Sequence, residues 1–469
     1  MDNRISFLSV RQIARHYRDG SLSPVEVVDA FIERIERFNP QLNALVTVTF
    51  ETARHQAKLA RDRLQKKDLD RLPHLCGIPF TVKDTLQTAG VRTTFGSPLF
   101  SDVIPAEDAA VVSALKRAGG ILLGKTNTPA FGWVGVTQNL VFGATPNPWN
   151  PAKTAGGSSG GAAVAACARL APINIGTDGG GSLRVPAAFT GIVGFKPSYG
   201  RVPNYPTGAN WSLQHIGPIA RSVDDIVMAF ETIAQPDERD PYSLPPGNVG
   251  EAISHQAGRR LRILFAPDLG FAEAIEPEII EVCRRAVAAF AEMKHDVTER
   301  KLEWPSPMEY WRTIFITGAA DRLGPFLKER STEIEPQLRE FIREGQRLPA
   351  DAYYRACLAR NDWWQVICPT LDDYDLLITP TVACSPFALG LETPGTIAGR
   401  AVSFYGWLPF CAPFNLTGQP AISLPAGTTA DGAPVGMQIV GRRFADATVL
   451  AAGAAFEHAR PWPKWNSAA

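Results

Sequence analysis

One glycine-rich stretch, residues 154–186, constrains the fold of this chain more than any other part of its sequence. It reads TAGGSSGGAAVAACARLAPINIGTDGGGSLRVP and presents two serines in glycine settings, Ser158 in GGSSGG and Ser182 in DGGGSLR. Glycine tolerates unusual dihedral angles and lets backbone N–H groups approach a ligand closely. The small residues between the serines predict a tightly packed helix followed by a short strand over residues 173–176. Two such turns around one compact element would bring both hydroxyls to a common pocket.

Length and charge exclude several classes of protein. A chain of 469 residues can bury a sizeable core, and large α/β enzymes of this length often fold as one unit. Lysine plus arginine and aspartate plus glutamate number 47 each, so the net charge predicts neither a nucleic-acid nor a membrane partner. The start, MDNRISFLSV, has no basic segment followed by an apolar run, and no later run is long enough to span a bilayer. We therefore expect a cytoplasmic protein.

The seven cysteines are widely scattered, odd in number and contain no CxxC pair. This pattern is typical of buried thiols rather than of disulfide bridges or metal ligands.

Residues 5–70 are predicted to be helical. The clearest signal is a capping box at Ser23–Glu26 with proline at the first helical position. Apolar residues then repeat at three- and four-residue spacing until Asn39-Pro40, where we expect this helix to stop. A second helix is predicted over residues 51–64, followed by a charged connector over residues 65–71.

Strands and helices then alternate. Apolar residues at every second position of 76–84 predict a strand with Lys83 at its end, and a helix over 108–118 and a buried strand over 121–123 follow. This rhythm favours a largely parallel or mixed sheet covered by helices. Residues 194–197 are interpreted as a turn. Further helices are predicted over 223–233, 277–293 and 446–459, and further strands over 260–265, 376–378, 421–424 and 435–440.

The strands before and after a helical, aromatic-rich segment at residues 303–370 are expected to join one sheet. We therefore predict a single large α/β domain over residues 1–469, with a central mixed β-sheet covered on both faces by helices. Within it, residues 1–70 would be an N-terminal helical region, residues 71–235 the core around the glycine-rich stretch, and residues 303–370 a helical insertion that shapes the pocket.

A serine hydroxyl becomes an effective nucleophile only when a base removes its proton and donors stabilise the oxyanion that follows. The glycines before Ser182 can turn several N–H groups toward one point and so supply the donors. The usual base would be histidine, but none of the seven histidines lies in a recognisable catalytic motif. His16, His55 and His458 fall on predicted helices and His215 in a predicted loop, so each is interpreted as structural.

Lysine is the remaining candidate base. Its ordinary pKa of about 10.4 must fall to about 7 or 8 for the amine to accept a proton at neutral pH, and burial and nearby N–H dipoles can lower it. Lys83 at the end of an apolar strand fits this requirement. Lys125 in GKTN and Lys196 in GFKP are competitors that spacing alone does not separate from it.

The paired motifs GGSSGG and DGGGSLRVP resemble the signature of the amidase signature family of serine hydrolases. Supporting matches extend over most of the chain: GIPFTVKD, GKTN, NPWNP, GFKPSYGRVP, HIGPIARSVDD, DLLITPT, FNLTGQPAISLP and PVGMQIVGR. The N-terminal helical region and the aromatic helical segment lack distinctive matches.

The resemblance implies hydrolysis of a carboxylic amide by a Ser-cisSer-Lys triad. Ser182 would be the acylated nucleophile, Ser158 would relay protons after a cis Gly157-Ser158 bond, and Lys83 would be the general base. The oxyanion hole would be formed by four backbone N–H groups, those of Gly179, Gly180, Gly181 and Ser182.

Neighbouring residues are expected to support this site rather than to react. Asp178 and Arg184 are interpreted as paired posts of the GGGS turn, and Ser159 is set aside because the spacing matches the first serine of its pair. The chain departs from the commonest family pattern at Ala155, where proline often stands, and at Thr85, where some members have asparagine. Neither position touches the implied triad.

Three alternatives compete with a stand-alone amidase. The first is the glutaminase subunit of a tRNA-dependent amidotransferase, which works within an assembly; the segment WLPFCAPFN before LTGQPA favours the stand-alone type. The second is a catalytically inactive binding module, which the presence of all three triad positions disfavours. The third is a phosphate loop: GGILLGKT at residues 119–126 has the GxxxxGK[ST] spacing, but its residues 121–123 are predicted as a buried strand and not as a loop.

The expected ligand is a small-molecule amide, with no metal or organic cofactor, no nucleic acid and no membrane partner, and a homodimer is left open. Pocket walls are expected from loops at 128–138, 204–215 and 304–410, which carry several aromatic residues: Phe131, Trp133, Tyr205, Trp211 and Trp311. This composition favours an apolar or aryl acyl group.

Overall fold

The computed structural model describes residues 4–66, 73–256 and 258–465. Most of its strands form one sheet: β1 (Leu45–Val48), β2 (Pro79–Lys83), β3 (Ile121–Thr126), β4 (Ile173–Asp178), β5 (Val193–Lys196), β6 (His215–Ala220), β7 (Arg262–Phe265), β8 (Asp296–Glu299), β9 (Leu376–Pro380), β12 (Ala421–Thr428) and β13 (Pro434–Gly441). A separate short hairpin pairs β10 (Thr396–Ile397) with β11 (Arg400–Ala401).

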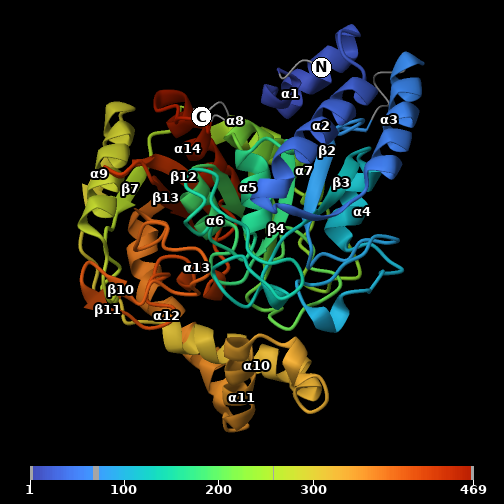
Figure 1. The fold of residues 1–469 in the computed structure, drawn as a ribbon. Helices are drawn as coiled ribbons and strands as arrows, with labels where there is room; N and C mark the ends of the chain where they lie inside the picture. The colour runs from blue at the N-terminus through green and yellow to red at the C-terminus, as the bar shows by residue number, and fades with distance from the viewer. Residues whose placement is uncertain (1–3, 67–72, 257, 466–469) are drawn as a thin grey trace.

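The 11-stranded sheet has the order β1-β3-β2-β4-β6-β5-β12-β13-β9-β7-β8 (Figure 1). Near one edge β3, β2 and β4 are parallel, and at the other edge β9, β7 and β8 are parallel. The strands between β4 and β9 are joined by antiparallel pairs. The predicted mixed sheet is therefore confirmed.

The α-helices described are α1 (Val10–Asp19), α2 (Pro24–Leu42), α3 (Phe50–Gln65), α4 (Ala110–Arg117), α5 (Gly160–Cys167), α6 (Arg184–Thr190), α7 (Val223–Ile233), α8 (Val249–Gln256), α9 (Pro277–Glu292), α10 (Met308–Leu323), α11 (Pro336–Arg347), α12 (Ala352–Asp373), α13 (Pro413–Leu416) and α14 (Asp446–Ala459). Within the described residues no helix is long and apolar enough to cross a bilayer.

Helices cover both faces of the sheet, and β12 shows how. Ile422 and Leu424 belong to one core cluster together with residues of α7, α9 and α14. Ala421, which directly precedes Ile422, belongs to a second cluster with residues of α6 and of α10 to α12. Because successive strand residues point to opposite faces, the two clusters lie on opposite sides of the sheet.

The capping box at the start of α2 is confirmed. The side chain of Ser23 accepts a hydrogen bond from the N–H of Glu26, and the carboxylate of Glu26 accepts one from the N–H of Ser23. The predicted stop at Asn39-Pro40 is wrong, because α2 includes Pro40 and continues to Leu42. Pro40 lies in the last turn, where its missing N–H interrupts the helical pattern just before the helix ends.

Three other expectations differ from the structure. A strand, β1, interrupts the predicted helical region and pairs with β3. Residues 194–197, predicted as a turn, lie largely in β5, and His215, predicted in a loop, is the first residue of β6. Residues 194–197 and 215–220 contain glycine and proline, which are typical of turns. Their backbone hydrogen bonds to neighbouring strands nevertheless place them in the sheet. Most of the predicted connector at 65–71, with the boundary at residue 70, lies outside the described residues.

The glycine-rich stretch folds as predicted into α5 and β4. The start of α5 meets the loop after β4, because the N–H of Ser159 donates to the Ser182 carbonyl at 3.2 Å. Glycine is required at the start of α5, since a Cβ on Gly161 would lie 2.3 Å from the backbone nitrogen of Asn127. Both serine-bearing turns therefore lie side by side at the carboxyl end of β4.

All seven cysteines are free thiols. Five of them are buried as predicted, while Cys357 and Cys368 are partly exposed.

Candidate active site

Lys83, the last residue of β2, contacts the turn that begins the glycine-rich stretch. Its Nζ donates hydrogen bonds to Ser158 Oγ at 2.6 Å and to Thr177 Oγ1 at 2.9 Å. The Gly157-Ser158 peptide bond is cis. Complete burial lowers the pKa of Lys83 to about 7, against the charge of Asp178, which raises it. The amine is therefore available in its neutral form near pH 7, in contact with a serine hydroxyl.

The two competing lysines are held elsewhere. Lys125 Nζ donates to the Leu86 carbonyl and to two threonine hydroxyls. Lys196 Nζ donates to the Gln419 carbonyl and, at 3.3 Å, to the carbonyl of the proline that follows it. Burial lowers the pKa of both amines, that of Lys125 to about 7. Geometry and not pKa therefore distinguishes Lys83, which alone of the three contacts a serine of the glycine-rich stretch.

Ser182 lies in the loop between β4 and α6 and is partly exposed. It lines the same cavity as Ser158, together with Thr177 and the three glycines before it. Among the described residues, no hydrogen bond joins Ser182 Oγ to Ser158 or to any other group. The structure thus links Lys83 to Ser158 directly and brings Ser182 to the cavity that Ser158 lines.

The glycine loop, residues 179–182 between β4 and α6, offers backbone donors to this cavity. The N–H of Gly181 is directed elsewhere, since it donates to Asp178 Oδ1 at 2.7 Å. The N–H groups of Gly180 and Ser182 donate to no acceptor within the described part of the chain. Trp311 of α10 orients the first peptide of this loop, because its indole N–H donates to the Gly179 carbonyl at 2.8 Å. The N–H of Gly180 lies in the same peptide plane and points away from that carbonyl, so its direction is fixed as well.

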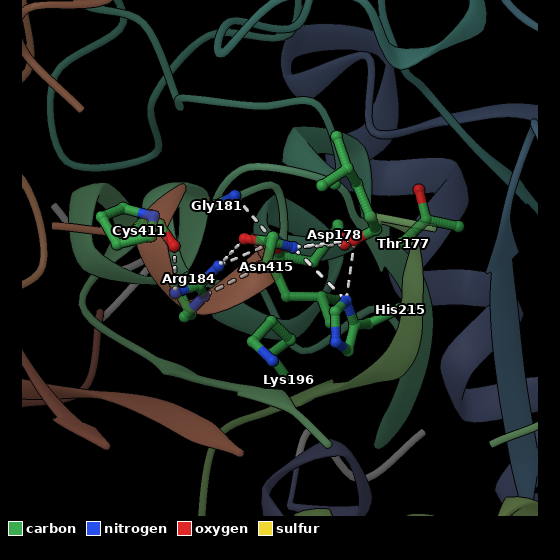
Figure 2. Close-up of polar contacts among 12 residues, drawn as sticks. Thr177, Asp178, Gly181, Arg184, Lys196, His215, Cys411 and Asn415 are labelled. Atoms are coloured by element: carbon green, nitrogen blue, oxygen red, sulfur yellow. Dashed lines mark hydrogen bonds and ion pairs between the residues drawn. The ribbon is translucent and has the colours of Figure 1, made fainter. Parts of the chain in front are cut away.

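A fully buried ion pair between Asp178 and Arg184 lies next to the loop and holds it in place (Figure 2). Arg184 Nη2 lies 2.8 Å from Asp178 Oδ1, and its Nε donates to Asp178 Oδ2 at 2.9 Å. Burial by itself raises the pKa of Asp178, but the charge and hydrogen bonds of Arg184 outweigh it and hold that pKa below its ordinary value. The predicted role of these two residues as paired posts agrees with this geometry.

Two further residues complete the support of the loop, and sequence reasoning did not single them out. Asn415 Nδ2 donates to the Asp178 carbonyl at 2.8 Å, and its Oδ1 accepts from Arg184 at 2.6 Å. Gln438 Oε1 accepts from Arg184 Nη1 at 2.6 Å. Both lie in motifs quoted above, FNLTGQPAISLP and PVGMQIVGR. Their place in these motifs was the sequence signal that could have identified them.

Thr177 was also missed, although it precedes Asp178 directly and provides the second acceptor for Lys83. The structural interpretations of Ser159 and His215 agree with their contacts. Ser159 Oγ donates to the Thr177 carbonyl at 3.0 Å. His215 Nδ1 lies 2.8 Å from the Leu213 carbonyl, and burial holds its pKa well below the ordinary value.

Aromatic side chains form the walls of the cavity. Phe131, Trp133 and Trp311 line it as expected. Phe131 and Trp133 also line a second, larger cavity of about 490 Å³, to which Tyr205 contributes. Trp211 was expected in the pocket walls, and this prediction is wrong. It lines neither of these two cavities but stacks on Tyr242, with ring centroids 5.1 Å apart.

Comparisons with known proteins agree over nearly the whole chain. The family model described as Amidase matches residues 26–450. An acylamidase of Rhodococcus erythropolis is 38% identical, over 98% of this chain and 97% of that protein. A glutamyl-tRNA(Gln) amidotransferase subunit of Moorella thermoacetica is 35% identical, over 96% of each chain. The crystal structure of a bacterial aryl acylamidase of the amidase signature family superposes with a TM-score of 0.90 at 31% identity, covering 97% of this chain and 96% of that one. The chain therefore belongs to the amidase signature family and is an amidase-type hydrolase of carboxylic amides.

Proposed function

We propose that this chain is a stand-alone amidase that forms an acyl-enzyme on Ser182. The observation that carries the proposal is the 2.6 Å hydrogen bond between Lys83 Nζ and Ser158 Oγ, at a cavity that Ser182 also lines. Burial that lowers the pKa of Lys83 to about 7 supports its role as general base. Ser158 would then connect the base to the nucleophile.

In the proposed reaction, neutral Lys83 takes the proton of Ser158, which takes the proton of Ser182 as that hydroxyl attacks the amide carbonyl carbon. The ammonium formed on Lys83 then returns a proton through Ser158 to the amide nitrogen. The C–N bond breaks, the amine or ammonia leaves, and an ester remains on Ser182. Water adds to this ester while Lys83 again accepts a proton through Ser158. That proton then returns to Ser182 Oγ as the ester C–O bond breaks, and the acid leaves as a carboxylate and a proton.

The oxyanion that develops in each step needs fixed donors. We assign this role first to the N–H groups of Gly180 and Ser182, which have no acceptor among the described residues. Gly179 lines the same cavity and remains part of the proposed oxyanion hole. Gly181 is the least available of the four predicted donors, because its N–H donates to Asp178.

The substrate is proposed to be an amide with an apolar or aryl group. The described lining of the catalytic cavity contains no aspartate, glutamate, lysine or arginine, and among the described residues that line the larger cavity Arg322 is the charged one. Aromatic rings line the larger cavity, with Phe100 packed edge-on against Phe131 and Phe326 at centroid distances of 5.5 and 5.8 Å. An aryl group would bury apolar surface against these rings.

The same walls disfavour the amidotransferase alternative. Free glutamine would bring an α-ammonium group into cavities whose described lining offers no carboxylate to pair with it. Burying an unpaired charge is costly. The acylamidase and aryl acylamidase relatives support the stand-alone assignment, whereas the similarity to an amidotransferase component leaves glutamine as the substrate to test against.

The test compares p-nitroanilides of aryl and aliphatic acids with glutamine, and measures nitroaniline or ammonia release. We expect kcat/KM to be at least about 100-fold higher for an aryl anilide, and intact-mass spectrometry during turnover to find an acyl group that is absent in Ser182→Ala. Hydrolysis confined to glutamine would overturn the substrate class. Turnover of anilides by Ser182→Ala at the wild-type rate would overturn the acyl-enzyme.

A further inference from the structure

Three buried arginines form a cluster at the other end of α5 from Ser158. Arg34 belongs to α2, Arg169 follows α5, and Arg221 follows β6. Their exposed fractions are 4%, 3% and 6%. Arginine is rarely buried to this degree without a carboxylate partner, so this arginine cluster (Arg34, Arg169, Arg221) requires an explanation.

The three guanidinium groups converge on one place. Arg34 Nε donates at 2.7 Å to the carbonyl that closes α5. The Arg169 guanidinium lies over the Phe7 ring, 3.8 Å from its centroid. Arg221 donates to the carbonyls of Phe7 and Leu8, at 3.4 and 2.8 Å. The cluster therefore joins the N-terminal segment to α2 and to the C-terminal end of α5.

Five nitrogens of the arginine cluster have no hydrogen-bond partner among the residues that the structure describes. They are Nη1 and Nη2 of Arg34, Nε and Nη1 of Arg169, and Nε of Arg221. Buried donors are almost always paired, and a group of unpaired donors in one place is typical of a site for a bound water or ion.

The charge of the cluster is not balanced by the described side chains either. None of its three arginines forms an ion pair with a described carboxylate. Asp225, which acts on Arg221 from beyond ion-pair distance, accepts its own hydrogen bond from the N–H of Val10 at 2.7 Å. Burial, and then the charges of the neighbouring arginines, lower the pKa of Arg34 to about 10. The negative end of the α5 dipole favours cations here, but it carries only a partial charge.

We propose that the arginine cluster binds a small inorganic anion. A halide, or a tetrahedral oxyanion such as sulfate or phosphate, would accept hydrogen bonds from the free nitrogens of Arg34 and Arg169 and offset the charge of all three side chains. Water would satisfy the donors but leave the charge unbalanced. The bound anion would fasten α2 and the N-terminal segment to the end of α5, and this role is independent of the proposed function.

The first test measures the thermal unfolding midpoint as chloride, sulfate or phosphate replaces gluconate at constant ionic strength. We expect a saturable rise of several degrees with at least one of the small anions, because a ligand that binds only the folded state stabilises it. Arg169→Gln should lose this rise, while Arg15→Gln, which removes an exposed charge from α1, should keep it. A rise that does not saturate, or that is equal in both variants, would overturn the proposal.

The second test does not depend on a variant that folds. Crystals of the unaltered protein grown in bromide should show an anomalous peak within hydrogen-bond distance of Arg34 and Arg169. The absence of a peak, or density there from a carboxylate of the chain itself, would overturn the site. A peak without any saturable stabilisation in solution would identify an adventitious ion only and would overturn it equally.

Discussion

At the scale of single residues, the balance of charges around Lys83 determines whether it can act as a base. Burial lowers its pKa, and the charge of Asp178 raises it. Asp178 is itself paired with Arg184 at 2.8 Å, which reduces the net field at Lys83. The two effects leave the pKa of Lys83 at about 7, so both the neutral and the protonated form are populated near neutral pH.

This balance predicts the pH dependence of activity. Because the proposed base is neutral Lys83, kcat/KM should rise with pH through a midpoint near 7 and fall about tenfold per pH unit below it. Lys83→Arg, which stays charged, should lower kcat by about 10²- to 10⁴-fold. Lys125→Met is the matched control, because burial lowers the pKa of Lys125 to about 7 as well. The pH profile is measured from initial rates between pH 5 and 9. If the midpoint near 7 disappeared in Lys125→Met, the assignment of Lys83 as the base would be contradicted.

Trp311 predicts a second effect at this scale. Trp311→Phe keeps the ring that stacks on Phe315 at 5.1 Å but loses the hydrogen bond to the Gly179 carbonyl. The glycine loop then becomes less fixed, so we expect kcat to fall about tenfold, the value of one net hydrogen bond. Trp363→Phe loses an equivalent bond to the Pro305 carbonyl, away from the cavity. Steady-state kinetics in which both variants lost activity equally would assign Trp311 a purely structural role.

At the scale of elements, the order of strands explains why the sequence left three lysines open. Lys83 is on β2, which pairs directly with β4, the strand that carries Thr177. Lys125 is on β3, on the far side of β2, and Lys196 is on β5, separated from β4 by β6. In the structure Lys83 and Lys196 are the last residues of short buried strands and Lys125 is the last but one of another. Local sequence spacing does not separate the three. Only the long-range pairing of the strands distinguishes them.

The same reasoning accounts for the elements that were predicted well and poorly. The local signals of α2, α5 and α14 lie in their own residues, as capping boxes, small-residue runs or regular apolar spacing, and these helices were predicted. The strands β1, β5 and β6 depend on partners far along the chain, and they were predicted as helix, turn and loop. The helix and strand of the glycine-rich stretch were predictable because the glycines that close packing requires, such as Gly161, can be read directly from the sequence.

The packing of α5 predicts the effect of a single added methyl group. Gly161→Ala would bring a Cβ within 2.3 Å of the backbone nitrogen of Asn127, so the start of α5 must shift. We expect a loss of about 1 to 3 kcal/mol in the free energy of unfolding, and lower kcat because Ser158 precedes this helix. Gly453→Ala in α14 is the control, with its nearest neighbour at 3.4 Å. Helix propensity predicts that the control gains up to about 1 kcal/mol in urea unfolding. A tolerated Gly161→Ala would contradict this packing argument.

At the scale of the whole molecule, the segments that carry the proposed catalytic residues differ from those that form the cavity walls. The two serine-bearing turns come from motif-bearing segments, whereas Trp311, Phe315 and Leu338, which line the cavities, come from α10 and α11, where no motif was found. In Figure 1 these helices protrude beyond one end of the sheet. Sequence reasoning placed this segment only loosely, since packing among aromatic side chains leaves no fixed spacing. The division of the chain into one domain with this segment as an insertion stays a prediction.

If these walls select the substrate, enlarging them should change selectivity and not chemistry. Phe326 lines the larger cavity, so Phe326→Ala removes a ring that packs on Phe100 at 5.8 Å. For a small anilide kcat/KM should fall about tenfold or more, because lost apolar contact is worth about 1 to 3 kcal/mol. For a bulkier aryl amide it should fall less or rise, since the new space can be filled. Tyr354→Ala on the exposed face of α12 should change neither value. Equal loss for both substrates in Phe326→Ala would show that this cavity does not select them.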